Sequence, residues 1–145
     1  MASLLLIEDD KPLQDVLKRM LEQGGHRVRT ADDGSQCVEL LERETTDLLI
    51  TDIFMPESDG IETIRRVRQR FADLKIIAIS GGGAWTTSTD YLWAAKMLGA
   101  DCTLRKPFRR TELLGAVERC LRGGDGPADG GADGAGSSGV PDRTT

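Results

Sequence analysis

The chain has few of the residues that build thiolate metal sites or disulfide frameworks. It contains three cysteines among 145 residues, Cys37, Cys102 and Cys120, and no two of them have the CxxC spacing. An odd and scattered set of this kind predicts neither a zinc site nor a network of disulfides. We therefore expect the cysteines to be small core or surface residues in a reducing cytosol.

Long hydrophobic runs and an excess of positive charge are also missing. The first apolar run, residues 4–7, has no basic segment before it and is followed at once by Glu8, Asp9 and Asp10. It predicts neither a signal peptide nor a membrane span. The formal net charge of −5 argues against nonspecific binding to nucleic acid or to an anionic membrane. We expect a cytoplasmic protein.

The composition that is present predicts one globular domain and a tail. Hydrophobic residues make up 39% of the chain and charged residues 30%, which is typical of a soluble domain. Residues 123–145 differ, because they hold eight of the seventeen glycines and only Val140 as a larger aliphatic residue. Such a segment cannot bury enough apolar surface to offset its chain entropy. We predict a domain at residues 1–122 and a disordered Gly/Asp-rich tail at 123–145.

Within the domain, short apolar runs alternate with helical patterns. The predicted strands cover residues 3–7, 26–31, 48–50, 75–79 and 101–105. The predicted helices cover about residues 12–23, 35–44, 61–71, 90–98 and 113–121. This alternation predicts an α/β fold with a parallel sheet and helices on both faces. Right-handed crossovers then place the carboxyl end of every strand at one edge.

Two helical patterns make more detailed predictions. The first helix has a stripe expected to face the core, formed by Leu13, Val16, Leu17, Met20 and Leu21. The third helix has an opposite, basic side expected to be solvated, formed by Arg65, Arg66, Arg68 and Arg70.

Polar residues follow the ends of four predicted strands. Glu8 and Asp9 follow the first, Asp52 the third, Ser80 the fourth and Lys106 the fifth. We expect these side chains to meet at the carboxyl edge of the sheet. Three carboxylates repel one another and favour a divalent cation, and all-oxygen ligands favour Mg²⁺.

The same residues suit phosphoryl chemistry. Asp52 can act as a carboxylate nucleophile that forms an acyl phosphate. Lys106 can balance the charge of a phosphoryl group, and Ser80 can donate a hydrogen bond to one of its oxygens.

The acidic residues also fit simpler roles, and the pattern has rival functions. Glu8, Asp9 and Asp10 are typical of a solvated turn or of the acidic start of a helix as well. A phosphatase of the haloacid-dehalogenase type needs a second aspartate two residues after the nucleophile, where this chain has Phe54. A flavodoxin needs hydroxyls and backbone amides in the loop that here contains the acidic run, and that run would repel phosphate unless a cation intervened.

Several motifs together resemble the receiver domain of two-component response regulators, over roughly residues 3–122. They are Leu5-Leu6-Ile7-Glu8-Asp9-Asp10, Asp52-Ile53-Phe54-Met55-Pro56-Glu57-Ser58-Asp59-Gly60, Ile76-Ile77-Ala78-Ile79-Ser80, Gly99-Ala100-Asp101 and Leu104-Arg105-Lys106-Pro107-Phe108. The resemblance implies a flavodoxin-like (βα)5 fold with a doubly wound, five-stranded parallel sheet of order 2-1-3-4-5.

The resemblance also implies a function. The phosphoryl group would pass from a phosphohistidine on a sensor histidine kinase or phosphotransfer protein to Asp52, with Mg²⁺ as cofactor. A protein of this type promotes its own phosphorylation and dephosphorylation but is not a conventional enzyme. It signals by binding a downstream protein or by passing the phosphoryl group onward.

By matching position, the resemblance assigns further roles. Glu8, Asp9, Asp52 and the backbone carbonyl of Phe54 would hold the metal. Ser80 would be the switch hydroxyl and Lys106 the basic residue, with the backbone amide of Gly81 also at the phosphoryl group. The bond between Lys106 and Pro107 corresponds to one that is cis in the family.

The chain departs from the family pattern in three respects. Thr103 stands where many receivers have a Tyr or Phe that couples phosphorylation to a partner surface. The segment from Ser80 to Gly99 is about four residues longer than in the family and contains Gly81-Gly82-Gly83, which predicts a mobile switch loop ordered by the phosphoryl group. No output domain follows Arg122, which predicts a stand-alone or truncated receiver. The alternative function is a pseudo-receiver that binds a partner without phosphorylation.

Overall fold

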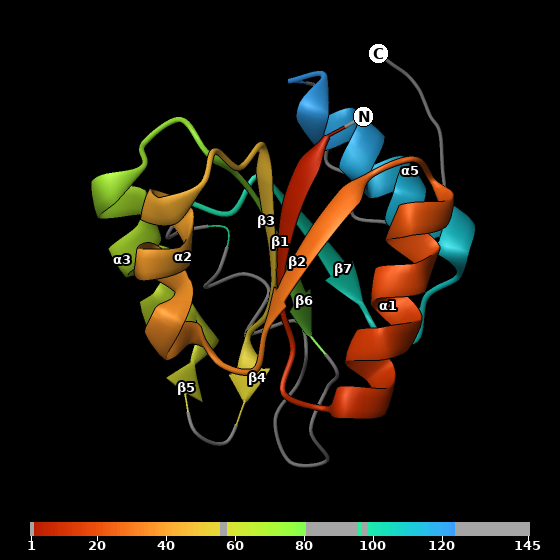
Figure 1. Ribbon diagram of the computed structural model, residues 1–145, viewed down its shortest axis with the longest axis horizontal. Coiled ribbons are helices and arrows are strands. Elements are labelled where there is room, and N and C mark those ends of the chain that lie inside the picture. The colour runs from red at the N-terminus through yellow and green to blue at the C-terminus, as the bar shows by residue number, and fades with distance from the viewer. Residues whose placement is uncertain (1, 56–57, 81–95, 97–98, 124–145) are drawn as a thin grey trace.

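The computed structural model describes residues 2–55, 58–80, 96 and 99–123 (Figure 1). The predicted switch loop, including Gly81, lies outside the described residues, as do most of the predicted helix at 90–98 and nearly all of the predicted tail.

The fold is built on a five-stranded parallel sheet. Its strands are β1 (Ser3–Ile7), β2 (Arg27–Ala31), β3 (Leu48–Asp52), β6 (Lys75–Ser80) and β7 (Cys102–Arg105). They lie in the order β2-β1-β3-β6-β7, which is 2-1-3-4-5 in chain order. The predicted fold class and strand order are thus confirmed.

Helices cover both faces of the sheet. Figure 1 shows α1 (Lys11–Gln23) and α5 (Arg110–Leu121) on one side and α2 (Cys37–Arg43) and α3 (Gly60–Arg70) on the other. The sequence pattern did not predict three short elements, the 3-10 helix η1 (Gly34–Gln36) and the antiparallel pair β4 (Phe54–Met55) and β5 (Ser58–Asp59).

The core forms two layers because successive residues of a strand point to opposite faces. In β1, Leu4 and Leu6 pack in the layer beneath α1 and α5, whereas Leu5 and Ile7 pack in the layer beneath α2 and α3. All five residues of the central strand β3 are buried. A strand covered on both faces gives a nearly continuous apolar run.

Helix α1 is placed by a polar cap and a buried stripe. Asp10 is the N-cap, and its Oδ1 accepts a hydrogen bond from the Leu13 backbone N–H at 3.2 Å. The prediction that Val16 faces the core was wrong, because 46% of this residue is exposed. The buried face contains Gln14, Leu17 and Leu21, whose spacings of three and four residues place them on one side of the helix.

Strand β2 lies at one edge of the sheet, and its sequence is more polar than that of the central strand. Its two arginines both reach Glu44, with Arg27 Nη2 at 2.6 Å and Arg29 Nε at 3.6 Å from the carboxylate. Arg29 also donates hydrogen bonds to the Leu40 carbonyl, at 2.9 Å, and to Thr46. The charged side chains of this strand are therefore anchored to α2 and to the loop that follows it.

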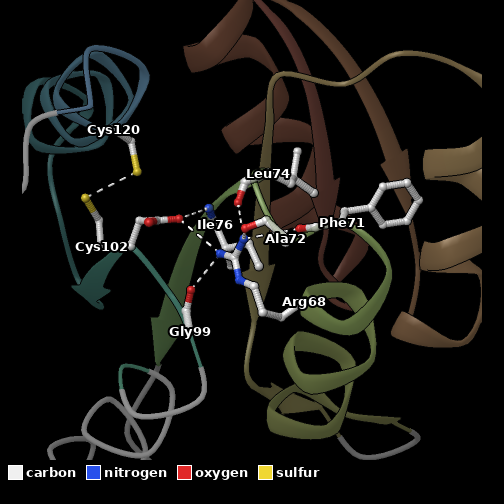
Figure 2. A network of polar contacts seen from close by, with 9 residues as sticks. Arg68, Phe71, Ala72, Leu74, Ile76, Gly99, Cys102 and Cys120 are labelled. Carbon is white, nitrogen blue, oxygen red and sulfur yellow. Dashed lines mark hydrogen bonds and ion pairs between the residues drawn. The ribbon is translucent and has the colours of Figure 1, made fainter.

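The amino-terminal end of the sheet is held by Arg68, near the end of α3 (Figure 2). Its guanidinium donates hydrogen bonds to the carbonyls of Phe71, Ala72 and Leu74 at 2.7–3.2 Å and to that of Gly99 at 2.6 Å. The prediction that this arginine belongs to a solvated face was wrong. Its planar guanidinium instead donates hydrogen bonds to the backbone carbonyls of the turn before β6.

Asp101 completes this contact network. Its Oδ2 lies 3.2 Å from Arg68 Nη2 and accepts a hydrogen bond from the Ile76 backbone N–H at 2.8 Å. The Asp101 backbone N–H in turn donates to the Ile76 carbonyl at 2.8 Å. The network therefore joins the end of α3, the start of β6 and the approach to β7.

No helix within residues 2–55, 58–80 and 99–123 has the length and hydrophobicity needed to span a membrane.

Candidate functional site

Acidic and basic side chains converge where the strands of the sheet end. Glu8 directly follows β1, Asp52 is the last residue of β3, and Lys106 directly follows β7. Glu8 and Asp52 are only 1% and 4% exposed, whereas Asp9 is exposed. The predicted convergence of these residues is therefore present in the structure.

Lys106 connects the two buried carboxylates. Its Nζ donates hydrogen bonds to Asp52 Oδ2 at 2.7 Å and to Glu8 Oε1 at 3.3 Å. Burial alone would lower the pKa of Lys106, but the ion pairs with Asp52 and Glu8 outweigh it and raise the pKa. The ammonium group is therefore held charged between the two acids.

Glu8 is an acid whose charge is only partly compensated. Its burial, followed by the negative charge of Asp52, raises its pKa to about 7. The Asp10 backbone N–H donates to Glu8 Oε2 at 3.1 Å and opposes this rise. In the absence of a cation, Glu8 thus holds a proton more tightly than an exposed glutamate does.

The three acids form a cluster with the composition of a cation site. Glu8, Asp9 and Asp52 each offer a carboxylate oxygen, and these atoms all lie within 4.8 Å of one another. When ionised they carry three negative charges, against the one positive charge of Lys106. A divalent cation would neutralise the remainder, and an all-oxygen donor set suits a hard cation. The residues therefore fit the predicted metal.

Gln14 positions this edge of the sheet, and the sequence analysis missed it. Its buried Nε2 donates to the Glu8 carbonyl at 2.9 Å, to the Ala31 carbonyl at 3.2 Å and to Asp32 Oδ1 at 3.2 Å. Lys11 Nζ donates to its Oε1 at 3.0 Å. The sequence did contain a signal for Gln14. This polar residue precedes Leu17 by three positions and Leu21 by seven, and such spacing places it on the buried face of the helix.

The acidic run after β1 combines two roles. Asp10 caps α1, as expected for the acidic start of a helix, while Glu8 and Asp9 belong to the carboxylate cluster. The capping role therefore belongs to Asp10, whereas Glu8 and Asp9 are the residues of the run that could bind a metal.

Of the other predicted site residues that the structure describes, Ser80 and Phe54 lie near the same edge, whereas Thr103 lies within β7. Ser80 is the last residue of β6 and pairs with Arg105 of β7. Phe54 begins β4 two residues after Asp52, and its role as a metal ligand stays a prediction. The Lys106–Pro107 peptide bond is cis, as the resemblance implied. Thr103 lies in β7 between the buried residues Cys102 and Leu104 and is partly exposed.

Comparison with known sequences places this geometry in a family. The sequence model of the response regulator receiver domain matches residues 4–118. The chain belongs to this receiver domain family. Its acidic cluster and its lysine therefore occur in a domain of two-component response regulators, as the motifs had indicated.

The receiver has similar relatives among known proteins. It is 38% identical over 123 residues to the response regulator receiver protein CpdR of Brucella abortus, with 83% of this chain and 98% of CpdR covered. It is 36% identical over 122 residues to the transcriptional regulatory protein CpxR of Escherichia coli, with 84% of this chain but 50% of CpxR covered. The chain thus spans nearly all of the first relative and half of the second.

Solved structures agree with the fold. A response regulator receiver domain protein from Clostridium thermocellum is 26% identical and aligns with a TM-score of 0.77, covering 84% of this chain and 95% of that one. The receiver domain of NtrX from Brucella abortus is also 26% identical, with a TM-score of 0.76 and coverages of 82% and 98%.

Proposed function

We propose that this receiver accepts a phosphoryl group on Asp52 from a phosphohistidine of a histidine kinase or phosphotransfer protein, with Mg²⁺ as its cofactor. The observation that carries the proposal is the position of Asp52. It ends the central strand, is buried, and lies 2.7 Å from the ammonium of Lys106 beside two further acids.

Asp52 and Lys106 have different roles in the proposed phosphoryl transfer. A carboxylate oxygen of Asp52 attacks phosphorus while the bond from phosphorus to the imidazole nitrogen breaks, and the histidine leaves with the electron pair of that bond. The ammonium of Lys106 moves from balancing Glu8 and Asp52 to balancing the new phosphoryl oxygens. Burial keeps water from most of the Asp52 side chain, which strengthens these charge interactions.

Glu8, Asp9 and Asp52 would hold the cation. Mg²⁺ bound there would neutralise the oxygens of the entering phosphoryl group and align it with the carboxylate. The formal charge of the cluster supports this assignment, because the three carboxylates, when ionised, carry more charge than the ammonium of Lys106.

The test is phosphorylation by a small donor. The purified chain is incubated with acetyl phosphate and Mg²⁺, and its intact mass is measured. We expect the wild type to gain the mass of one phosphoryl group and Asp52→Asn to gain none, because the amide is not a nucleophile. A matched control is Asp73→Asn, an exposed aspartate in the turn before β6, at the other end of the sheet. This variant should label like the wild type.

Three further outcomes test the acceptor, the function and the metal. A mass gain in both the wild type and Asp52→Asn would show that another residue is the acceptor. No gain in the wild type, under conditions that label a known receiver, would favour the pseudo-receiver. Omission of Mg²⁺ with a chelator present should abolish labelling if the acidic cluster works as proposed.

A further inference from the structure

Two of the three cysteines lie side by side at the end of the sheet opposite the acidic cluster. Cys102 begins β7 and Cys120 lies in the last turn of α5, 18 positions later in the chain. Their sulfur atoms are 3.3 Å apart, and each residue is 1% exposed (Figure 2). Sulfur atoms in a disulfide are about 2 Å apart, so little approach is needed to join them.

The two thiols are chemically unequal. Cys120 donates its S–H to the sulfur of Cys102, and this hydrogen bond, aided by the positive charge of Arg119, lowers the pKa of Cys102 to about 7. The same hydrogen bond, followed by burial, raises the pKa of Cys120. Because the thiolate is the reactive form, Cys102 is suited to attack and Cys120 to follow as the resolving thiol.

We propose that Cys102 and Cys120 form a reversible disulfide in the folded receiver when it meets a peroxide, and that this bond locks α5 to β7. The thiolate of Cys102 attacks one oxygen of the peroxide and the O–O bond breaks, so that a sulfenic acid forms and the other oxygen leaves as hydroxide. The hydroxide becomes water by taking up the proton that Cys102 had given to solvent. The sulfur of Cys120 then attacks the sulfur of Cys102, the S–O bond breaks and a second water leaves. Two thiols are oxidised by two electrons in total, and hydrogen peroxide is reduced.

Access to the pair comes from the end of α5. Cys120 is followed in the helix only by Leu121, and the Gly123 N–H donates to the Cys120 carbonyl at 3.1 Å in the terminal turn. Helix ends open more readily than helix centres, so transient opening of this turn would admit a small oxidant. Oxidation is therefore expected to be slower than that of an exposed thiol.

Cys37 supplies an internal control. It is fully buried in the layer beneath α2 and α3, on the other face of the sheet, and burial raises its pKa to about 12. Burial alone therefore disfavours the thiolate, the reactive form of a cysteine. The contact between two thiols distinguishes the Cys102–Cys120 pair.

The experiment is oxidation of the full chain followed by thiol counting. Folded protein is treated with hydrogen peroxide, quenched, unfolded and alkylated, and then analysed by intact mass and peptide mapping. We expect one alkylated cysteine, Cys37, and a peptide pair that joins Cys102 to Cys120. Dithiothreitol should restore three alkylated thiols. Cys37→Ala should still form the disulfide, whereas Cys102→Ala and Cys120→Ala should not form an intramolecular one.

Two results would overturn the proposal, and both are read on the wild type. One is three alkylatable thiols after peroxide treatment of the folded chain, when the same peroxide does oxidise the urea-unfolded chain. The other is a disulfide that involves Cys37. The lock is tested separately by urea unfolding, where the oxidised form should have the higher midpoint. An unchanged midpoint would show that the bond locks nothing.

Discussion

The two ends of the sheet differ in how their charged side chains are paired. At the amino-terminal end, the single charge of Arg68 is matched by Asp101 and by four backbone carbonyls. At the carboxyl end, Lys106 is outnumbered by three acids, and Glu8 has a raised pKa. A set of charges whose partners are complete is typical of a structural contact. A cluster in which acids outnumber the described bases and one acid has a shifted pKa is typical of a functional site.

The first of the two largest expected effects concerns Arg68, at the amino-terminal end of the sheet. Arg68→Ala removes the donor shared by five acceptor groups, so we expect the free energy of unfolding to fall by about 3 kcal/mol. Urea unfolding followed by circular dichroism measures the change. Because the acidic cluster is at the other end of the strands, Mg²⁺ affinity of the folded variant should stay at the wild-type value.

The matched control for this variant lies on the same helix. Arg65 is exposed and pairs with Glu62 one turn away, so Arg65→Ala should leave the urea midpoint unchanged. Equal urea midpoints for Arg68→Ala and Arg65→Ala would contradict the structural role that we assign to the Arg68 network.

A pH titration tests the acidic cluster at the carboxyl end of the sheet. The pKa of Glu8 rises from 4.5 in the unfolded chain to about 7 in the fold. Its protonated form therefore contributes stability that is fully present below pH 4.5 and is lost as the pH rises to about 7. In metal-free buffer this loss should amount to about 3 kcal/mol, measured by urea unfolding across the range.

Two comparisons isolate this contribution from those of other groups. Glu8→Gln should flatten that part of the pH profile, because the amide does not titrate. Saturating Mg²⁺ should also reduce the slope, since the cation would take the place of the proton on Glu8. A profile that is identical in the wild type and Glu8→Gln would mean that Glu8 is not the titrating group.

The smallest expected effect comes from the residue that joins the acidic cluster to the core. Gln14→Leu keeps the volume of the side chain but leaves the Glu8 carbonyl without the Gln14 amide, so we expect a loss of about 1–2 kcal/mol in stability. We also expect Mg²⁺ to bind roughly tenfold more weakly, because supporting contacts orient metal ligands. Isothermal titration calorimetry measures that affinity.

Val16→Thr is the control for the Gln14 variant. Val16 lies on the same helix and is exposed, so its substitution should change neither stability nor Mg²⁺ affinity. A Gln14→Leu variant that keeps wild-type Mg²⁺ affinity would limit Gln14 to a structural role.

The sequence predicted the parts of the molecule that depend on strand order. Apolar runs predicted the five strands, and the rule for parallel crossovers predicted that Glu8, Asp52 and Lys106 lie at one edge. These predictions succeeded because the order and direction of the strands determine where the residues at the strand ends lie. The acceptor role of Asp52 and the binding of a metal stay predictions.

The sequence did not predict contacts that depend on where individual side chains point. Arg68 and Arg65 lie on one helix in one basic segment, yet only Arg68 reaches the turn before β6. The meeting of Cys102 with Cys120 depends on how α5 packs on β7, which spacing along the chain does not encode. Val16 was wrongly predicted to face the core and Gln14 was not predicted to be buried, because the angular position on the helix, and not apolar character alone, decides burial.

The arginines of β2 have a consequence for how the protein behaves when it is concentrated. Within the described residues, β2 pairs with β1 alone, and the outer side of such a strand is a template on which another chain can add a strand. Arg27 and Arg29 are held there by Glu44, so fixed charge stands along that border. Charged side chains on an edge strand disfavour pairing with a second chain, so we expect these ion pairs to reduce edge-to-edge aggregation of the receiver.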